Sequence, residues 1–300
     1  MARRRLFTEL GRGVDLQGRD HTKAAVRALK DALHRNSLTV APALGYPREA
    51  MEVEILIGSA RPDEIDADAV AAVLPYGSPS VRVVRGGLEV PADEGDGATV
   101  IAGAAAVVWL DVDEAEGAEG PGDDADGGPE SRFPAGAPRD LAAEDRAQDA
   151  AREASDAETA GRAAPAAAGP GTPPPAPPGT TWRRIVLETG MGADLRGEDA
   201  TKAARRAVHD ALHSSSIALF RSLGVDPDSM AVEIRVGVQD PDAVDPGAVA
   251  AEAPHGRAVV VVERGGLDVP HPELGTRIVT ATAAVIARLA LPPGRFATGS

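Results

Sequence analysis

A stretch near the N-terminus, residues 11–23, holds most of the side chains in this chain that could do chemistry. Its carboxylates Asp15 and Asp20, together with Glu9, could bind a divalent cation through oxygen ligands or act as a general acid–base pair. Helix capping and solvation are the simpler interpretation of these carboxylates, and we prefer it to a metal site. We therefore predict no cofactor and keep a divalent cation as the alternative.

The glycines of this stretch indicate a binding loop. Gly11 and Gly13 precede the expected start of a helix, where free backbone N–H groups and the helix dipole attract anions. Lys23 adds a positive charge in the first turn. The pattern is not a Walker A loop, because no Gly-Lys-Ser/Thr follows, and Leu16 replaces the third glycine of a dinucleotide fingerprint. We predict an anion site here, with a purely structural turn as the alternative.

The expected helix carries Lys23, Arg27, Asp31 and His34 at spacings of four, four and three, which places them on one face. A solvated face and an interface or cleft both remain open for this stripe. A Ser–Lys nucleophile pair with Ser37 is disfavoured within one copy, because 14 helical residues span about 21 Å, so such a pair would need the lysine of one domain and the serine of another.

Two sets of candidate site residues follow. The predicted catalytic residues are Glu9, Asp15, Lys23 and His34, with the counterparts Glu188, Asp194, Lys202 and His213. The predicted ligand-binding residues are Gly11, Gly13, Gly18, Asp20, Thr22, Arg27 and Arg85, with Gly190, Gly192, Gly197, Asp199, Thr201, Arg206 and Arg264. In this scheme the lysine and the arginine of the helix hold an anion, and Asp15 or Glu9 moves a proton. Either His34 or Arg85 orients the substrate.

These counterparts exist because the chain is duplicated. Residues 7–91 align without a gap with residues 186–270, and about half of the positions are identical. The pair Arg85–Leu88 and Arg264–Leu267, both Arg-Gly-Gly-Leu, is one anchor of the alignment. His21 is replaced by Ala200 in the second copy, and we expect it at the surface. A period of this length indicates two whole domains.

The order of expected elements in one copy predicts an α+β fold. Strands are expected at residues 5–10, 51–58, 80–84 and 99–110, with helices at 23–34 and 65–74, a glycine-rich loop at 11–18 and a turn or bulge at 85–87. This β-α-β-α-β-β order predicts a mixed sheet with helices on one face. The other face needs cover, so we expect self-association between the repeat domains, within one chain or between chains.

Composition separates a linker from the domains. The formal net charge is −15, and residues 111–180, with 16 Asp and Glu against 5 Lys and Arg, supply −11 of it. We predict domains at residues 3–112 and 181–291, joined by a disordered acidic and then Pro/Ala-rich linker at 113–180. The absence of cysteine excludes disulfides, and no basic or aromatic-rich patch suggests nucleic acid. We expect a cytoplasmic protein without membrane contact.

The repeated motif resembles that of a family of short conserved hypothetical proteins, Gly-x-Gly-x-Asp-x-x-Gly-x-Asp-x-Thr-Lys-Ala-Ala followed by an Arg-rich helix. Gln17 and Arg196 stand where that family typically has histidine. The element order also looks like the trimeric α/β chorismate mutase fold, which imine deaminases and cyanuric acid amidohydrolases resemble. That resemblance implies sites between adjacent domains for small, often anionic molecules.

Two functions therefore remain open at this stage. The first is binding of a small polar or anionic metabolite at domain interfaces, with acid–base chemistry as an extension. The second is a non-catalytic, oligomeric binding or scaffold module whose glycine-rich motif is structural. Whether the loop and the Lys–Arg face converge on one site distinguishes the two.

Overall fold

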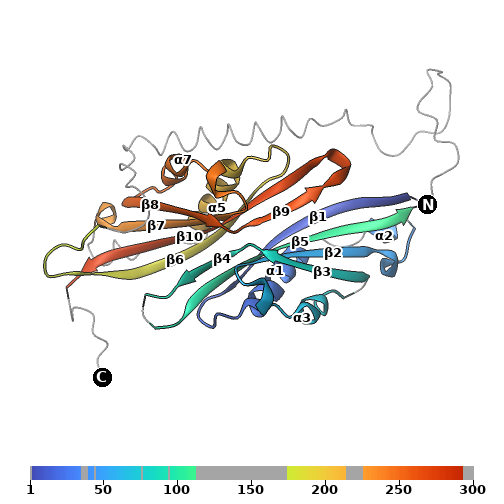
Figure 1. Ribbon diagram of the computed structural model, residues 1–300, viewed down its shortest axis with the longest axis horizontal. Helices are drawn as coiled ribbons and strands as arrows, with labels where there is room; N and C mark the ends of the chain where they lie inside the picture. The colour runs from blue at the N-terminus through green and yellow to red at the C-terminus, as the bar shows by residue number, and fades with distance from the viewer. Residues whose placement is uncertain are drawn as a thin grey trace, which may run out of the picture. The chain divides into compact units, whose positions relative to one another are not determined.

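A computed structural model of the chain describes residues 2–34, 40–43, 45–75, 77–93, 95–112, 174–213 and 226–292 (Figure 1). Both repeats fall within one compact unit. Most of the predicted linker, up to residue 173, lies outside the described residues, as do Ser37 and its counterpart Ser216. No helix among the described residues is long and apolar enough to cross a membrane.

Each repeat folds into the same succession of strands and helices. The first repeat contains β1 (Ala2–Asp15), α1 (His21–His34), α2 (Val40–Ala43), η1 (Arg48–Ala50), β2 (Glu52–Ser59), η2 (Pro62–Glu64), α3 (Ala67–Ala71), β3 (Ser78–Arg85), β4 (Leu88–Pro91) and β5 (Ala98–Val112). The second contains β6 (Thr181–Asp194), α5 (Ala200–His213), η3 (Pro227–Ser229), β7 (Ala231–Val238), η4 (Pro241–Ala243), α7 (Pro246–Ala250), β8 (Arg257–Arg264), β9 (Leu267–His271), η5 (Pro272–Leu274) and β10 (Thr276–Leu291).

The sheet of each repeat is mixed, which confirms the predicted α+β class. The strand order is β1-β5-β2-β3 in the first repeat and β6-β10-β7-β8 in the second, with β4 and β9 paired to the ends of β5 and β10. Strands β2 and β3 run parallel, as do β7 and β8, and the other pairs are antiparallel.

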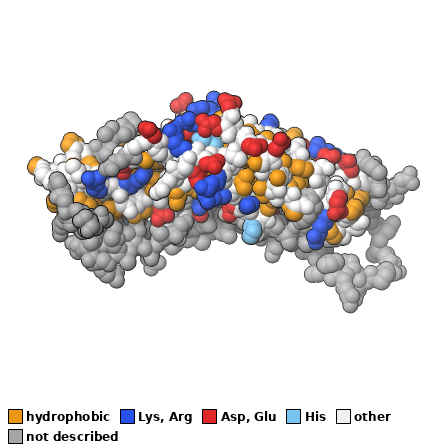
Figure 2. All heavy atoms as spheres, turned by 90° about the horizontal axis from the view of Figure 1, so that it is seen from below, with side chains coloured by type: hydrophobic (Ala, Val, Ile, Leu, Met, Phe, Trp, Pro, Cys, Tyr) orange, Lys and Arg blue, Asp and Glu red, His pale blue; other side chains and the backbone are white. Residues whose placement is uncertain are grey.

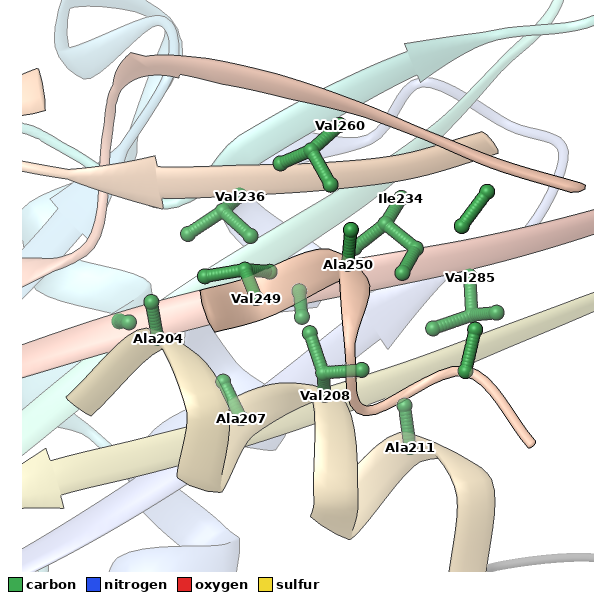
Figure 3. Packing of buried hydrophobic residues seen from close by; sticks show 14 of the residues in the cluster. Ala204, Ala207, Val208, Ala211, Ile234, Val236, Val249, Ala250, Val260 and Val285 are labelled. Carbon is green, nitrogen blue, oxygen red and sulfur yellow. The ribbon is translucent and has the colours of Figure 1, made fainter. Parts of the chain in front are cut away.

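Helices cover one face of each sheet because alanines let them approach closely. In α1, the residues Ala24, Ala28 and Ala32 are fully buried, and Ala24 and Ala28 share a core with Ile55 and Ile57 of β2. The second repeat repeats this packing, and Figure 3 shows Ala204, Ala207 and Val208 of α5 in one buried cluster with Val236 and Val260. The predicted alanine stripe of the helix is therefore the part of the core nearest to the motif.

The other face of each sheet contacts the other repeat. In one buried cluster, Leu56 and Ala105 of the first repeat meet Leu267 and Val269 of β9. In a second cluster, residues of β4 and β5 meet residues of β6 and β10; the buried members are Leu88, Val90, Ile101, Ala284 and Ile286. The two contacts are related by the internal repeat, because β9 is the counterpart of β4.

The Arg-Gly-Gly-Leu segments meet at the centre of this contact. The N–H of Gly87 donates to the carbonyl of Gly266 (2.9 Å), and the N–H of Gly266 donates to the carbonyl of Gly87 (3.1 Å). These two glycines are counterparts in the two repeats, so the bridge lies on a local two-fold axis. A Cβ on Gly86 or on Gly265 would lie 2.2 Å from a carbonyl oxygen of the other repeat. The predicted turn is therefore also a point of backbone contact between repeats.

Three local predictions were wrong. The expected loop at residues 11–18 begins too early, because β1 and β6 continue through both glycines to Asp15 and Asp194. The second helix is only Ala67–Ala71, with Asp66 as its N-cap. Strand β4 was not predicted, because its four residues give too short a period-two pattern.

Candidate functional site

The motif glycines are required by close packing of helix on strand. A Cβ on Gly13 would lie 2.0 Å from the Ala24 carbonyl oxygen, and one on Gly11 would lie 2.3 Å from that of Ala28. Neither glycine has a positive φ. Gly190 and Gly192 meet α5 in the same way. The glycines therefore let α1 and α5 lie directly on β1 and β6, and their N–H groups lie within a strand.

Asp15 closes the short loop that follows β1. Its side chain is almost fully buried, its Oδ2 accepts the Asp20 N–H (3.2 Å), and its Oδ1 lies 2.6 Å from Lys23 Nζ. A Cβ on Gly18 would lie 2.6 Å from the same carboxylate. Burial alone raises the pKa of Asp15, but the hydrogen bonds from Lys23 and from backbone N–H groups lower it below its ordinary value. Asp15 is therefore held as a carboxylate.

Lys23 and Arg27 converge on this carboxylate. Arg27 donates to the Val14 carbonyl (2.5 Å), and its Nη1 lies 3.8 Å from Asp15 Oδ1. In the second repeat, Lys202 lies 3.5 Å and Arg206 3.9 Å from Asp194. The predicted Lys–Arg face and the end of the glycine stretch do meet. They meet at a buried carboxylate of the chain itself, Asp15 in the first repeat and Asp194 in the second.

The remaining motif residues hold the helix start in place. Asp20 Oδ1 accepts the Lys23 N–H (2.8 Å), which makes it the N-cap. The Thr22 hydroxyl donates to the Glu64 carbonyl (3.1 Å) and accepts the Asp66 N–H (2.9 Å). Asp199 and Thr201 make the same contacts in the second repeat. These residues therefore join the loop, α1 and η2 into one unit.

The structure separates other predicted site residues. Glu9 and Asp15 lie six residues apart on β1, which corresponds to about 20 Å, so they cannot form an acid–base pair. Glu188 and Asp194 are separated in the same way on β6. Asp31 accepts the Arg12 backbone N–H (3.0 Å).

The ends of the predicted helix face lie away from Asp15. His34 is exposed at the last position of α1. His213 stacks on His209 at the end of α5. Arg85 donates to the Ala60 carbonyl (3.4 Å), and its counterpart Arg264 is an exposed residue at the end of β8. Lys23 and His34 lie eleven residues apart on α1, which corresponds to about 16 Å along the helix axis, so their side chains do not meet at Asp15.

A second cluster, which the sequence did not reveal, lies around His21. The prediction that His21 is a surface residue is wrong: its side chain is 0% exposed. Its Nδ1 lies 3.0 Å from Ser59 Oγ, and its Nε2 lies 3.4 Å from Glu89 Oε2 and 3.8 Å from Glu64 Oε2. Nε2 has no hydrogen-bond partner among the described residues.

Two arginines cover this cluster from the solvent side. Arg61 donates to both oxygens of Glu89 (2.9 and 3.1 Å) and to Glu64 (3.1 Å). Arg19 donates to Glu89 (2.8 Å). Burial raises the pKa of Glu89, but the hydrogen bonds and positive charges of Arg61 and Arg19 together lower it below its ordinary value. Burial also lowers the pKa of His21, against the opposing effect of Glu89.

The order Ser59–His21–Glu89 resembles a hydrolase triad in composition, but the geometry does not support nucleophilic catalysis. Ser59 is fully buried at the end of β2, and its hydroxyl also accepts the Arg61 N–H (3.3 Å). A nucleophile must reach its substrate, and Ser59 has no solvent-accessible surface. The cluster is instead a buried polar network.

The second repeat lacks this network. Counterparts of Arg19, His21, Ser59, Arg61, Glu64 and Glu89 are Glu198, Ala200, Val238, Asp240, Ala243 and Asp268. Burial raises the pKa of Asp268, and Arg277, 3.4 Å away, lowers it in part. A comparison of the two copies shows that all six of these positions change, although about half of the aligned positions do so.

Charges on the described surface are mixed. Figure 2 shows basic and acidic side chains next to one another on the face it presents, without a broad area of one sign. Among the described residues, no group of three or more His, Asp or Glu side chains is placed to hold a metal ion.

The sequence profile of a family described as "Conserved hypothetical protein (Lin0512_fam)" matches the chain twice, at residues 5–108 and 184–287, which together exceed half of its length. The chain belongs to this family. The two Lin0512_fam matches coincide with the two folded repeats and confirm the predicted tandem duplication. No curated protein matches the chain.

One similar solved structure is described as an FtsZ-like protein of unknown function from Nostoc punctiforme PCC 73102. It is 32% identical to the chain, with a TM-score of 0.34, and the match covers 38% of this chain and 100% of that one. The predicted likeness to the chorismate mutase fold stays a prediction.

Proposed function

We propose that the shared motif builds and joins two domains, and that the chain acts as a self-paired, non-catalytic binding or scaffold module. The observation that carries this proposal is that the motif residues make the same internal contacts in both repeats. Asp15 and Asp194 contact the lysine and arginine of the helix in the same repeat. The four motif glycines leave room for the helix backbone to pack directly on the strand.

Pairing of the repeats supports the same proposal. The sheet face without helices is apolar, and a lone repeat would expose it to water. The glycine bridge adds a backbone contact that only residues without a Cβ permit. Self-association between repeat domains is therefore the role that we assign to the Arg-Gly-Gly-Leu segments.

A second candidate function is binding of a small polar or anionic molecule by the first repeat. The observation that favours it is the pair of guanidinium groups of Arg19 and Arg61, whose side chains are 38% and 43% exposed beside the repeat contact. The Lys23 and Lys202 ammonium groups offer a second place for an anion, in exchange with the chain's own carboxylates. A divalent cation remains the alternative partner of these carboxylates.

A thermal-shift screen separates the candidates. The panel holds phosphate, sulfate, small carboxylates and polar metabolites, each with and without magnesium, because a ligand at 100 times its Kd adds about 2.7 kcal/mol of stability. The wild type is compared with the double variant Lys23→Ala/Lys202→Ala and with Lys30→Ala, which removes an exposed lysine elsewhere on α1.

Our proposal expects no hit that depends on Lys23 and Lys202. A hit lost in the double variant and kept in Lys30→Ala would overturn the claim that the shared motif is purely structural and would establish the anion site.

A further inference from the structure

We propose that the buried network of His21, Ser59 and Glu89 is an acid-sensitive latch that ties helix α1 to strand β4 where the two repeats meet. The network has no equivalent in the second repeat, where Ala200 and Val238 replace His21 and Ser59. It is not used by the motif contacts described above, and it joins elements that are far apart in the sequence.

The network links the start of one helix to the contact between repeats. His21 is the first residue of α1, Ser59 is the last residue of β2, and Glu89 lies in β4. The neighbours of Glu89 on β4, Leu88 and Val90, are buried in the cluster that includes β10 of the second repeat. A change in the His21–Glu89 contact therefore acts on a strand that packs against the other repeat.

The hydrogen-bond donors and acceptors around His21 explain why a second proton on the imidazole is unfavourable. With neutral His21, the Ser59 hydroxyl donates to Nδ1 and the Nε2–H faces Glu89, so each group has a role. Protonation of Nδ1 forces the hydroxyl hydrogen to turn away. Ser59 Oγ already accepts the Arg61 N–H, and no described acceptor other than Nδ1 lies within its reach. A buried hydroxyl is then left without an acceptor, next to a buried charge.

Charged groups face His21 from the packed elements around it. Glu64 from η2 and Glu89 from β4 favour the imidazolium, while Arg61 and Arg19 oppose it. Burial outweighs the carboxylates, and the pKa of His21 in the fold is lower than usual. A lowered histidine pKa means that the unfolded chain binds the proton more readily. The stability that neutral His21 contributes is therefore fully present above the histidine pKa of the unfolded chain. It is lost as pH falls from that pKa through the lower pKa of His21 in the folded protein.

The second repeat serves as a control within the same molecule. Ala200 and Val238 replace His21 and Ser59, so α5 starts without a titrating residue at this position. Its Asp268 has a raised pKa and titrates as a carboxyl, so β9 is a poor reference. Strand β7 and the N-terminal half of helix α5, which lies away from His209 and His213 at the other end of the helix, are suitable references for the effect of pH.

Hydrogen exchange of the full chain tests the latch. Protection factors, corrected for intrinsic exchange, are measured at about pH 7.5 and about pH 5.5, on either side of the ordinary histidine pKa of about 6.5. We expect protection of β4 and of the first turn of α1 to fall about threefold or more at the lower pH, while β7 and the N-terminal half of α5 keep theirs.

Two variants decide the outcome. In His21→Ala the fall on acidification should disappear, because the titrating group is gone. The double variant His21→Ala/Ser59→Val copies the second repeat and provides the same test if the single variant does not fold. The proposal is overturned if wild-type β4 keeps its protection at the lower pH, if the N-terminal half of α5 loses as much as the first turn of α1, or if the folded variant still responds.

Discussion

Replacing Gly13 with alanine tests whether the motif glycines serve packing or binding. The new Cβ would lie 2.0 Å from the Ala24 carbonyl oxygen and 2.2 Å from the Ala28 nitrogen. Contacts under 3.0 Å are essentially absent for real Cβ atoms, so helix and strand must separate by at least 1 Å. Both neighbours are backbone atoms, which cannot rotate away as a flexible side chain can.

The cost of this separation can be estimated from core overpacking. Such changes typically cost about 1–3 kcal/mol, and a backbone-to-backbone clash belongs at the upper end, about 3 kcal/mol. With a urea m-value of about 2 kcal/mol/M, this loss lowers the unfolding midpoint by about 1.5 M. A glycine in an open loop would behave differently, because alanine there changes stability by about 1 kcal/mol or less.

Tryptophan fluorescence reports this change in one repeat. The chain has two tryptophans, and Trp182→Phe leaves Trp109 of β5 as the reporter on the first repeat. Gly97→Ala is the matched control, because its Cβ would make an ordinary contact of 3.6 Å with Ala92. We expect a large loss for Gly13→Ala and almost none for Gly97→Ala. Equal midpoints for the two variants would refute the packing argument.

Two further predictions concern charged contacts. Asp15→Asn should cost about 1.5–3 kcal/mol near neutral pH, the range for hydrogen bonds to charged groups. Because the pKa of Asp15 is lowered in the fold, its contribution is present above the unfolded value of about 3.9 and is lost as pH falls through the folded value. Urea unfolding at several pH values should therefore show the two proteins converging in acid, and a constant gap would contradict this. Arg12→Met, which copies Met191, removes the contacts of Arg12 with Asp210 (2.8 Å) and with the Thr189 carbonyl. We expect a loss of about 1 kcal/mol or less in urea unfolding, and a gain in stability would show that the pair is unfavourable.

The spacing of apolar residues along the sequence predicted the helices and strands because the residues at those spacings are the ones buried in the core. The alanine stripe of α1 and the alternating apolar residues of β2 are buried as expected. The glycine stretch was misread because glycine suits both a loop and a close approach, and the sequence does not show which one applies. The Cβ distances at Gly11 and Gly13 decide the matter, and they depend on where α1 lies in space.

The candidate site was predicted only in part, for a related reason. Spacing along α1 placed Lys23 and Arg27 on one face, and both do approach Asp15. The His21 network joins residues 38 and 68 positions apart, and no local pattern connects them. What the sequence does contain is the joint replacement of His21 and Ser59 by Ala200 and Val238, a signal available from the duplication alone.

Cleavage of the connection between the repeats tests most directly the claim that they form one paired structure. A specific protease site is inserted between residues 113 and 173, the folded protein is cut, and the products are examined by size exclusion and native mass spectrometry at low micromolar concentration. The account predicts that the two halves remain together as one complex of unchanged size, held by the apolar sheet faces and the Gly87–Gly266 bridge. Separation into two folded, independent halves would contradict it.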